Sequence, residues 1–393
     1  MQTINEIYDH LKGDKVIWFI VGLLGLFSIL AVYSAAGSMA FRYRDGNTEY
    51  YLIQQAVFIM VGFVVMYICY NLHYMQYSKW APYLLLPTIV LLLWTIFFGT
   101  EINEARRWIS IPWIDKTIQT SDIAKLTLII FIARSLSMRQ DVIKGFKTGF
   151  MPVLAAVCMI CMLIVPADLS TAGLLFLTCL LMMFIGRVSM KYIILLMLIG
   201  AVGMLLIWAL GTVFPDMIRI ETWSARINEF LYTDGGYQIE QSKIAIANGG
   251  WIGVGPGGSF QKNYLPYPYA DFIYSIICEE YGVVGGLFIL GLYLWLLIRC
   301  IGIVTRCPKA FGAILAMGLC LNLVIQAFAN IAVSVHLLPV TGLTLPLVSM
   351  GGTSMLFTCM SLGIILSVSR YVEEAKDKRI ELSEIEVRDA NSF

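Results

Sequence analysis

Long runs of apolar residues, repeated along the whole chain, constrain the possible folds more than any other feature of this sequence. Of its 393 residues, 59% are hydrophobic and only 13% are charged, and the mean hydropathy is +0.78. A water-soluble surface of this size needs far more charge. A helix of about 20 apolar residues crosses a bilayer. The sequence therefore predicts an all-α polytopic membrane protein.

The apolar runs predict ten transmembrane helices between a short N-terminal segment, 1–15, and a charged tail, 371–393. They cover residues 16–36, 50–72, 80–98, 122–137, 149–166, 169–186, 192–214, 271–298, 310–332 and 346–369. The fourth run is short and weakly apolar. We expect one membrane domain over 16–370 and a tail that is partly disordered.

The distribution of basic residues predicts the orientation. Cytoplasmic loops of membrane proteins carry an excess of Lys and Arg. If the ten spans alternate, most of the 27 Lys and Arg residues fall on the side of the two termini. Both termini are therefore expected in the cytoplasm. The long 215–270 segment, between the seventh and eighth helices, then lies outside, and it is too long to be a simple connector without helical pieces.

Composition argues against several other classes of protein. The nine cysteines fall in apolar runs or short basic loops, which argues against a disulfide framework. The three histidines have no metal-ligand spacing. Gly253-x-Gly255-x-x-Gly258 fits a dinucleotide fingerprint by letter, but no strand precedes it, so we reject that interpretation. No nucleic-acid partner is expected, although the net charge of +1 is uninformative on this point.

Asp271 is the leading candidate for a catalytic group. It lies at the outer membrane boundary, directly after Tyr267-Pro-Tyr-Ala270. A carboxylate placed there is costly unless it is used or paired. It could act as a general base whose pKa is set by partial burial and by neighbouring cations. The alternative is a helix N-cap, a position that favours Asp, and the two roles are compatible.

Basic residues on the outer side form a candidate site for an anion. Arg suits phosphate because its planar fork binds two oxygens. Contact with lipid headgroups is the simpler interpretation of each one alone. Lys125, early in the weak fourth run, either pairs with Asp122 or faces a cavity and holds an anion. The other outward cations are Arg106, Arg107, Arg226, Lys243 and Lys262.

Three further carboxylates are candidates for supporting roles. Glu279 and Glu280 are adjacent and lie inside the eighth apolar run, so they must pair with a cation or face a wet cavity. Asp168 lies in the tight turn between the fifth and sixth runs, where a turn or capping role is sufficient.

Two uncharged, turn-rich stretches lie on the outer side. The N–H groups of the glycine run, 249–258, could cradle a phosphate. The polar stretch from Pro339 to Ser354 is expected to form part of a cavity wall, because non-helical backbone at membrane depth must be buried or line a cavity.

Several separate stretches, in one order along about residues 12–372, resemble the SEDS family, the membrane proteins of shape, elongation, division and sporulation. The glycine run is more similar to the division member of the family than to the elongation member. The usual acidic–histidine step before the key Asp is replaced here by Tyr267-Pro-Tyr-Ala270. The matching stretches are Arg106-Arg107-Trp108-Ile109, Gln119-Thr-Ser-Asp122 with Lys125, Pro166-Ala-Asp168-Leu-Ser-Thr, Gly249 to Pro266 with Ser259, Gln261 and Lys262, Asp271-Phe-Ile-Tyr with Glu279-Glu280-x-Gly282, and Pro339 to Ser354.

The resemblance implies a peptidoglycan glycosyltransferase that polymerises lipid II into glycan strands during cell division. Asp271 would be the general base. The substrate-binding residues would be Arg107, Lys125, Arg226, Ser259, Gln261 and Lys262, supported by Asp168, Glu279 and Glu280. The implied location is the bacterial cytoplasmic (inner) membrane at the division septum. The implied partners are a class B penicillin-binding transpeptidase and other divisome membrane proteins.

The cofactor requirement is expected to be small. A divalent cation, Mg²⁺ or Mn²⁺, could share in stabilising the leaving group, but the sequence does not identify its ligands. No nucleotide is needed, because the lipid-linked donor already carries a pyrophosphate.

Other functions are kept as alternatives. An elongation-type polymerase would use the same chemistry along the lateral wall. A lipid II flippase would need polar residues spread across the bilayer, whereas the spare polar groups here gather on the outer side. A scaffold that only recruits a transpeptidase would leave Asp271 dispensable. An ion-coupled transporter is disfavoured because no repeated broken-helix pattern is visible.

Overall fold

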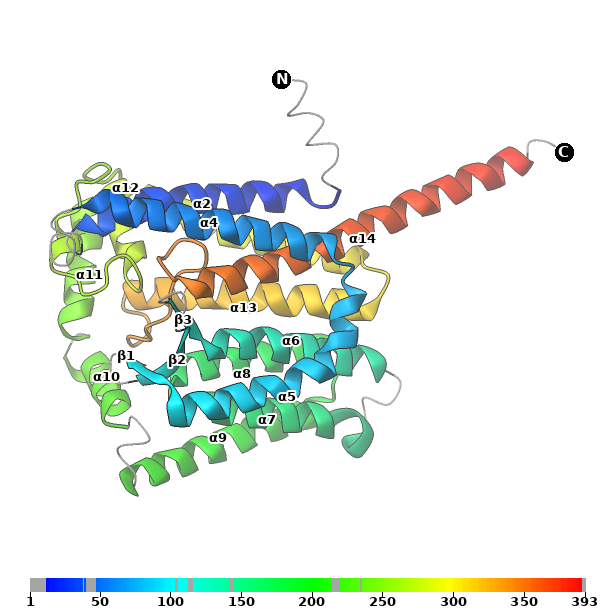
Figure 1. The fold of residues 1–393 in the computed structure, drawn as a ribbon, viewed down its shortest axis with the longest axis horizontal. Helices are drawn as coiled ribbons and strands as arrows, with labels where there is room; N and C mark the ends of the chain where they lie inside the picture. The colour runs from blue at the N-terminus through cyan, green and yellow to red at the C-terminus, as the bar shows by residue number, and fades with distance from the viewer. Residues whose placement is uncertain are drawn as a thin grey trace.

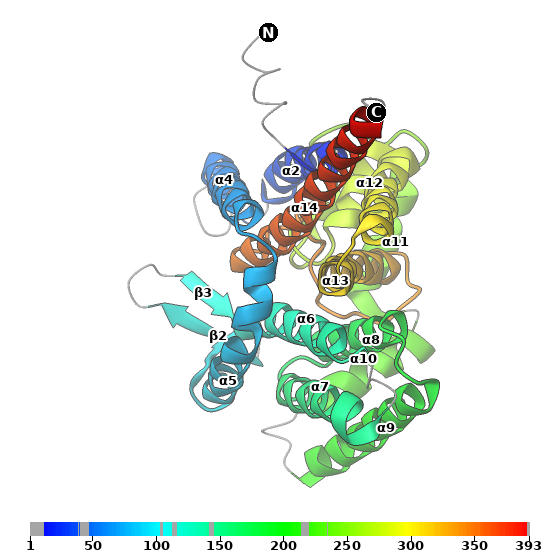
Figure 2. The same cartoon turned by 90° about the vertical axis from the view of Figure 1, so that its right-hand side faces the viewer.

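The structure is a computed structural model that describes residues 12–37, 39, 47–102, 105–111, 116–140, 145–213, 220–233 and 235–390. Long helices lie side by side in a bundle (Figure 1). The strands and two shorter helices gather at one end of this bundle, and the last helix projects from the other end. The view along the bundle separates the helices into a group around α2, α4 and α12 and a group around α5, α7 and α9 (Figure 2).

Each of the ten predicted apolar ranges contains a helix. These helices are α2 (Lys15–Ala35), α4 (Thr48–Asn71), α5 (Met75–Phe98), α6 (Thr120–Met138), α7 (Met151–Ile164), α8 (Leu169–Ile185), α9 (Met190–Val213), α12 (Ile273–Arg306), α13 (Ala310–Ser334) and α14 (Thr353–Ala390). A π-helical turn, Phe146–Phe150, leads into α7. Within the described ranges, seven helices are long and apolar enough to cross a membrane, and α6, α7 and α8 are not among them. The protein is a multi-pass membrane protein, and the count of ten spans stays a prediction.

The long outer segment contains the helical pieces that its length predicted. They are α10 (Ile220–Tyr232), α11 (Gly236–Gly249) and a single 3₁₀ turn, Gln261–Asn263. Both helices lie at the end of the bundle that also carries the strands (Figure 1).

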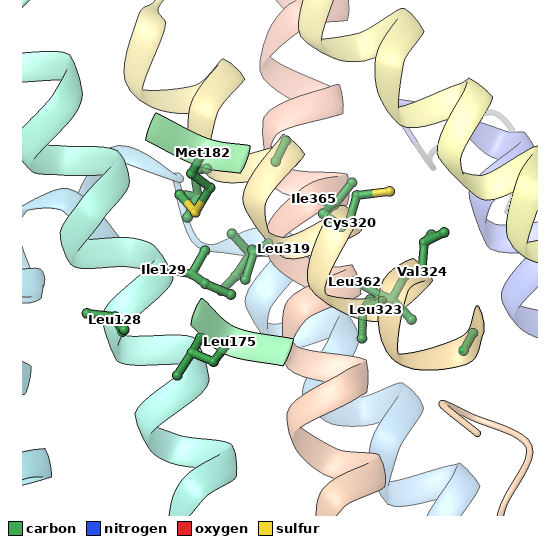
Figure 3. Close-up of a cluster of buried hydrophobic side chains, with 14 of the residues drawn as sticks. Leu128, Ile129, Leu175, Met182, Leu319, Cys320, Leu323, Val324, Leu362 and Ile365 are labelled. Atoms are coloured by element: carbon green, nitrogen blue, oxygen red, sulfur yellow. The ribbon is translucent and has the colours of Figure 1, made fainter. Parts of the chain in front are cut away.

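Helix α13 is the centre of the bundle. Of its apolar window, 72% is buried, compared with 22% for α9, which leaves most of α9 to face lipid. Interlocking side chains supply the van der Waals contacts that hold membrane helices together. Leu319 and Leu323 of α13 pack among side chains from three other helices (Figure 3): Leu128 and Ile129 of α6, Leu175 and Met182 of α8, and Leu362 and Ile365 of α14.

A small β-sheet corrects the all-α expectation. Strands β1 (Thr100–Ile102), β2 (Ala105–Ile111) and β3 (Lys116–Gln119) form an antiparallel sheet in the order β1-β2-β3. Trp108 of β2 lies opposite Gln119 of β3. The β-branched residues Ile109, Thr117 and Ile118 favour this extended backbone. The sheet is easily missed in the sequence because each strand is short and lies between two apolar helices.

Two predicted spans contain non-helical backbone. Helix α12 is broken at Gly282, whose φ of 69° and ψ of −172° are essentially restricted to glycine. Residues 346–352 are not helical, so α14 begins at Thr353, later than predicted. Both breaks place irregular backbone inside the bundle, which requires it to be packed against protein or to line a cavity.

The tail differs from its prediction. Helix α14 continues to Ala390, so partial disorder was the wrong expectation for residues 371–390. Its sequence is rich in good helix formers such as Glu, Lys, Ala and Leu, and Arg370 pairs with Glu374 one turn later at 3.0 Å. Residues 391–393 and 1–11 lie outside the described residues.

Candidate active site

A cavity of about 440 Å³ opens where the sheet, the outer segment and the helix ends meet. Its wall combines side chains from β2, β3, α6, α8, α10, α11 and α13 with the 267–271 and 340–354 segments. Five of the predicted site residues line it together: Arg107, Lys125, Asp168, Arg226 and Asp271. They come from five separate parts of the chain, so only the tertiary fold assembles them.

Asp271 lies two residues before α12 and contributes to the cavity wall. The residue directly before α12 is Phe272, and no side chain caps the helix. Asp271 therefore does not act as the N-cap of α12 in this structure. Among the described residues, no group donates a hydrogen bond to the Asp271 carboxylate. Within the described part of the chain, this carboxylate is therefore available to a ligand.

The pKa of Asp271 reflects a balance between burial and charge. Removal from water raises it from its ordinary value of 3.8 to about 6. The positive charges of Arg226 and Arg107 oppose this rise, and the negative charge of Asp168 adds to it. A carboxylate with a pKa of about 6 is ionised at neutral pH and accepts a proton more readily than an ordinary Asp.

Arg107 has donors that the protein does not use. Its Nη1 contacts Asp168 Oδ2 at 3.0 Å, and Asp168 also caps α8 by accepting from Thr171 N at 3.1 Å. A guanidinium has five N–H donors. The Nε of Arg107 is buried and has no hydrogen-bond partner in the described structure. A buried, unsatisfied cationic donor at a cavity wall is suited to an anionic ligand.

The other two cations approach the cavity from different sides. Arg226, on α10, donates from Nη1 to Val340 O at 3.1 Å. Lys125, on α6, pairs with Asp122 at 2.7 Å and lies 3.4 Å from Gln326 Oε1. Both interpretations of Lys125 are therefore compatible with the structure, because it pairs with Asp122 and also lines the cavity.

The predicted wall between Pro339 and Ser354 is present. Seven residues of this stretch line the cavity: Val340, Gly342, Leu343, Thr344, Met350, Gly351 and Ser354. Gly342 has a φ of +70° and faces the Asp271 carboxylate. The left-handed backbone at this position favours glycine.

Four predicted residues lie in a second cluster and do not line the cavity: Ser259, Gln261, Lys262 and Glu279. The Glu279 carboxylate accepts from the Ser259 hydroxyl, from Phe260 N at 3.2 Å and from Gln261 N at 3.2 Å. Lys262 Nζ donates to Gly257 O at 2.9 Å. Glu279 therefore organises the turn at 259–262 and lies outside the cavity lining.

Glu280 is buried behind this turn, and it too lies outside the cavity. Its carboxylate accepts from the Ser34 hydroxyl of α2. Both adjacent carboxylates thus have protein partners, as their depth in the membrane requires.

The glycine run packs tightly against the break in α12. Val254 N and Gly255 N donate to the carbonyls of Glu279 and Glu280 at 3.0 Å each, and Val283 N donates back to Gly250 O at 2.9 Å. A Cβ at Gly282 would overlap the Trp251 carbonyl. The N–H groups of Val254 and Gly255 are thus used within the protein, so they are not free to cradle a phosphate.

Two polar residues of α13 that support the cavity, Gln326 and Asn330, were not among the predicted site residues. Gln326 contacts both Lys125 and Thr344 O, and Asn330 donates to Asp271 O and to Leu343 O. Asn322 lies four residues before Gln326 on the same buried face, but it does not line the cavity. Polar residues at helical spacing in an otherwise apolar span were the signal that could have identified them.

The described residues do not supply a ready metal site. No group of three or more His, Cys, Asp or Glu among them is placed to hold a metal ion. Two of the cavity carboxylates, Asp122 and Asp168, are paired with cations. Asp271 is the described cavity carboxylate without such a cationic partner, so any divalent ion there would have few protein ligands.

Comparison with known proteins identifies the family. The family of cell cycle proteins that groups FtsW, RodA and SpoVE matches residues 14–374. Stage V sporulation protein E of Bacillus subtilis (strain 168) is 34% identical over 363 residues, covering 91% of this chain and 97% of that protein. A probable peptidoglycan glycosyltransferase FtsW of Geobacter sulfurreducens is 34% identical over 383 residues, covering 95% and 98%.

Solved structures share the fold. A chain from a peptidoglycan synthase complex that coordinates polymerization and crosslinking aligns with a TM-score of 0.70 at 24% identity, covering 92% of this chain and 98% of that one. The rod shape determining protein RodA of Thermus thermophilus aligns with a TM-score of 0.66 at 23% identity, covering 92% and 98%. The match over residues 14–374 and the 34% identity together show that this chain belongs to the FtsW/RodA/SpoVE family of cell cycle proteins, the SEDS family indicated by its motifs.

Proposed function

We propose that the protein is a peptidoglycan glycosyltransferase that polymerises lipid II. One observation carries the proposal: the Asp271 carboxylate, which accepts no hydrogen bond from the described residues, shares a cavity of about 440 Å³ with Arg107, Arg226 and Lys125. A base beside a cluster of cations is what transfer of a sugar from a pyrophosphate donor requires. Relatives that carry the name peptidoglycan glycosyltransferase match this chain over most of its length.

The proposed reaction is a single displacement. Asp271 accepts the proton of the acceptor's N-acetylglucosamine 4-hydroxyl while that oxygen attacks C1 of the donor's N-acetylmuramic acid. The bond from C1 to the pyrophosphate oxygen breaks, undecaprenyl pyrophosphate leaves with the electron pair, and the anomeric configuration inverts. A base with a pKa of about 6 holds the proton weakly enough to release it to water afterwards.

The leaving group gains negative charge, and fixed cations stabilise it without reorganisation. We assign this role to Arg107, Arg226 and Lys125 because they line the cavity with Asp271. Lys262 is left out of the set because its ammonium group donates to Gly257 O, away from the cavity. We assign to Asp168 the role of orienting the Arg107 side chain, which it contacts at 3.0 Å.

A divalent cation is proposed only as an additional positive charge near the leaving group. If present, it would neutralise charge on the leaving group; the described cavity carboxylates are committed to Arg107, to Lys125 and to proton transfer. The side chains present do not require it, since three cations already line the cavity.

We further propose that the protein acts in the bacterial inner membrane at the division septum, with both termini in the cytoplasm. The proposed partners are a class B penicillin-binding transpeptidase and other divisome membrane proteins. Support comes from relatives that carry the division name FtsW and from the structural likeness to a chain of a peptidoglycan synthase complex.

The decisive test is polymerisation of labelled lipid II by the purified protein with its transpeptidase partner. Wild type is compared with Asp271→Asn and Asp271→Ala. The matched control is Glu240→Gln, an exposed carboxylate on α11. We expect both Asp271 variants to lose about 100-fold or more of the rate while still binding lipid II, as expected for loss of a general base, and the control to keep it.

Other outcomes would point elsewhere. Normal polymerisation by both Asp271 variants would overturn the assignment of the base. A wild-type protein that makes no glycan but moves lipid II across liposomes would support the flippase alternative.

A further inference from the structure

Three consecutive carbonyl oxygens in front of α12 are each held by a different donor. They belong to residues 269–271, and the contacts are Met350 N to Tyr269 O at 2.9 Å, Ser349 Oγ to Ala270 O at 2.6 Å and Asn330 Nδ2 to Asp271 O at 2.7 Å. The backbone that carries Asp271 is therefore bound along its length to α13 and to the segment before α14.

Asn330 uses both of its N–H donors in this arrangement. Its Nδ2 donates to Leu343 O at 2.7 Å as well as to Asp271 O, so one amide joins two segments that both line the cavity. The side chain is 1% exposed, and its Oδ1 has no partner in the described structure. No other donor described here reaches the Asp271 carbonyl.

Ser349 makes the second connection. Its hydroxyl donates to Ala270 O and accepts from Leu345 N at 2.8 Å. At 2% exposure, it is as inaccessible to water as Asn330. Water cannot easily replace either bond, so losing one would free the backbone next to Asp271.

We propose that Asn330 and Ser349 are positioning residues that fix the Asp271 carboxylate in the cavity. The carboxylate has no hydrogen bond of its own to the described protein, so its position follows from the backbone that carries it. Precise placement of a base matters because a misplacement of about 1 Å costs about 100-fold in rate. The inference rests on the proposed function of Asp271 as the base.

The test substitutes Asn330→Leu, which keeps the size of the side chain and removes both donors. We expect kcat for lipid II polymerisation to fall by about tenfold to 100-fold, with KM within twofold of wild type. Ser349→Ala, which removes a single atom, should lower kcat in the same direction. A role limited to stability would instead lower the amount of folded protein and leave kcat per folded molecule unchanged.

The matched control is Asn322→Leu. Asn322 is buried on the same face of α13, two turns from Asn330. In the described structure it makes no hydrogen bond to residues 269–271 or 343–350. Thermal midpoints and elution profiles of all variants establish that each one folds.

The outcomes separate this inference from the proposed function when Asp271→Asn is assayed in parallel. An inactive Asp271→Asn with reduced kcat in Asn330→Leu and Ser349→Ala, but not in Asn322→Leu, supports the inference. An inactive Asp271→Asn with normal kcat in both positioning variants overturns it and leaves the proposed function standing. An active Asp271→Asn overturns both. Equal loss of kcat in Asn322→Leu also overturns it, because the effect would then belong to α13 as a whole.

Discussion

Individual charged side chains in the cavity differ in how much of their charge the protein already neutralises. Asp168 and Asp122 have cationic partners at 3.0 and 2.7 Å. Asp271 is affected by Arg226 and Arg107 only through their charge, without a hydrogen bond. Desolvation therefore outweighs attraction at Asp271, and its pKa rises although two arginines are near. The raised pKa suits Asp271 to the role of the base.

The pH dependence of the reaction follows from this balance. The base must be ionised, so activity is present above a pH of about 6 and is lost as the pH falls through it. Below that value, kcat/KM for lipid II should fall about tenfold per pH unit. Arg226 lowers the pKa of Asp271, so Arg226→Gln should move this acid limb to higher pH, whereas Arg226→Lys should move it less.

The measurement is the initial rate of lipid II polymerisation between pH 5 and 8. Arg106→Gln serves as the control, because Arg106 is exposed and pairs with Glu101 at 3.5 Å, outside the cavity lining. An acid limb at the same pH in wild type and Arg226→Gln would show that the titrating group is not Asp271.

Which charged residues belong to the site was easier to predict from the sequence than where their side chains lie. Asp271, Arg107 and Arg226 were predictable because charge at a membrane boundary is rare and costly. Lys262 was expected among the substrate-binding cations, but the turn at 259–262 directs its ammonium group to Gly257 O. That turn depends on Glu279, 17 residues further along the chain, and such a contact is not readable from local sequence.

Elements that break within the bundle determine the shape of the site. The two halves of α12 meet at Gly282, where the backbone of the glycine run exchanges hydrogen bonds with the α12 backbone on both sides of the break. Gly249 and Gly253 face the Cys278 and Glu280 carbonyls so closely that a Cβ at either would overlap them. Glycine is required here for close approach of two backbones, which explains the motif without a bound phosphate.

A prediction at this scale compares two glycines of α12. Gly282→Ala should destabilise the protein by about 1–3 kcal/mol of backbone strain, with further cost from the clash with the Trp251 carbonyl. Gly291→Ala should be neutral or slightly stabilising, because Gly291 is helical, exposed and has open space at its Cβ position. The thermal midpoint of each purified variant in detergent measures the difference. Equal midpoints for the two variants would contradict the tight packing at the break.

Sequence patterns predicted long helices well and short elements poorly. Apolar runs determine where a helix can lie in a membrane, so each predicted range contains one. The sheet of β1, β2 and β3 escaped because strands of 3, 7 and 4 residues give too little alternation to recognise. The start of α14 was predicted too early because Pro346 and Gly352 are embedded in an apolar context, although both disfavour a helix.

At the scale of the whole molecule, the polar chemistry is collected at one end. The sheet, α10 and α11 lie at one end of the bundle, while α14 extends beyond the other (Figure 1). The cavity opens among the first group. A polymerase of lipid-linked sugars needs that end to face the compartment where the cell wall is built. The proposed function therefore requires the cavity end of the bundle to face outward, as the distribution of basic residues predicts.

Cysteine labelling tests the orientation. All nine native cysteines are free, and only Cys158 and Cys307 are not fully buried, so replacing these two by Ser gives a quiet background. Asn263→Cys then adds an exposed thiol to the cavity end, and Asp377→Cys adds one to α14. A membrane-impermeant maleimide should label the first in intact spheroplasts and the second only after lysis. The reverse pattern would place Asp271 in the cytoplasm, where a glycan strand could not join the wall, and the proposed function would fail with the orientation.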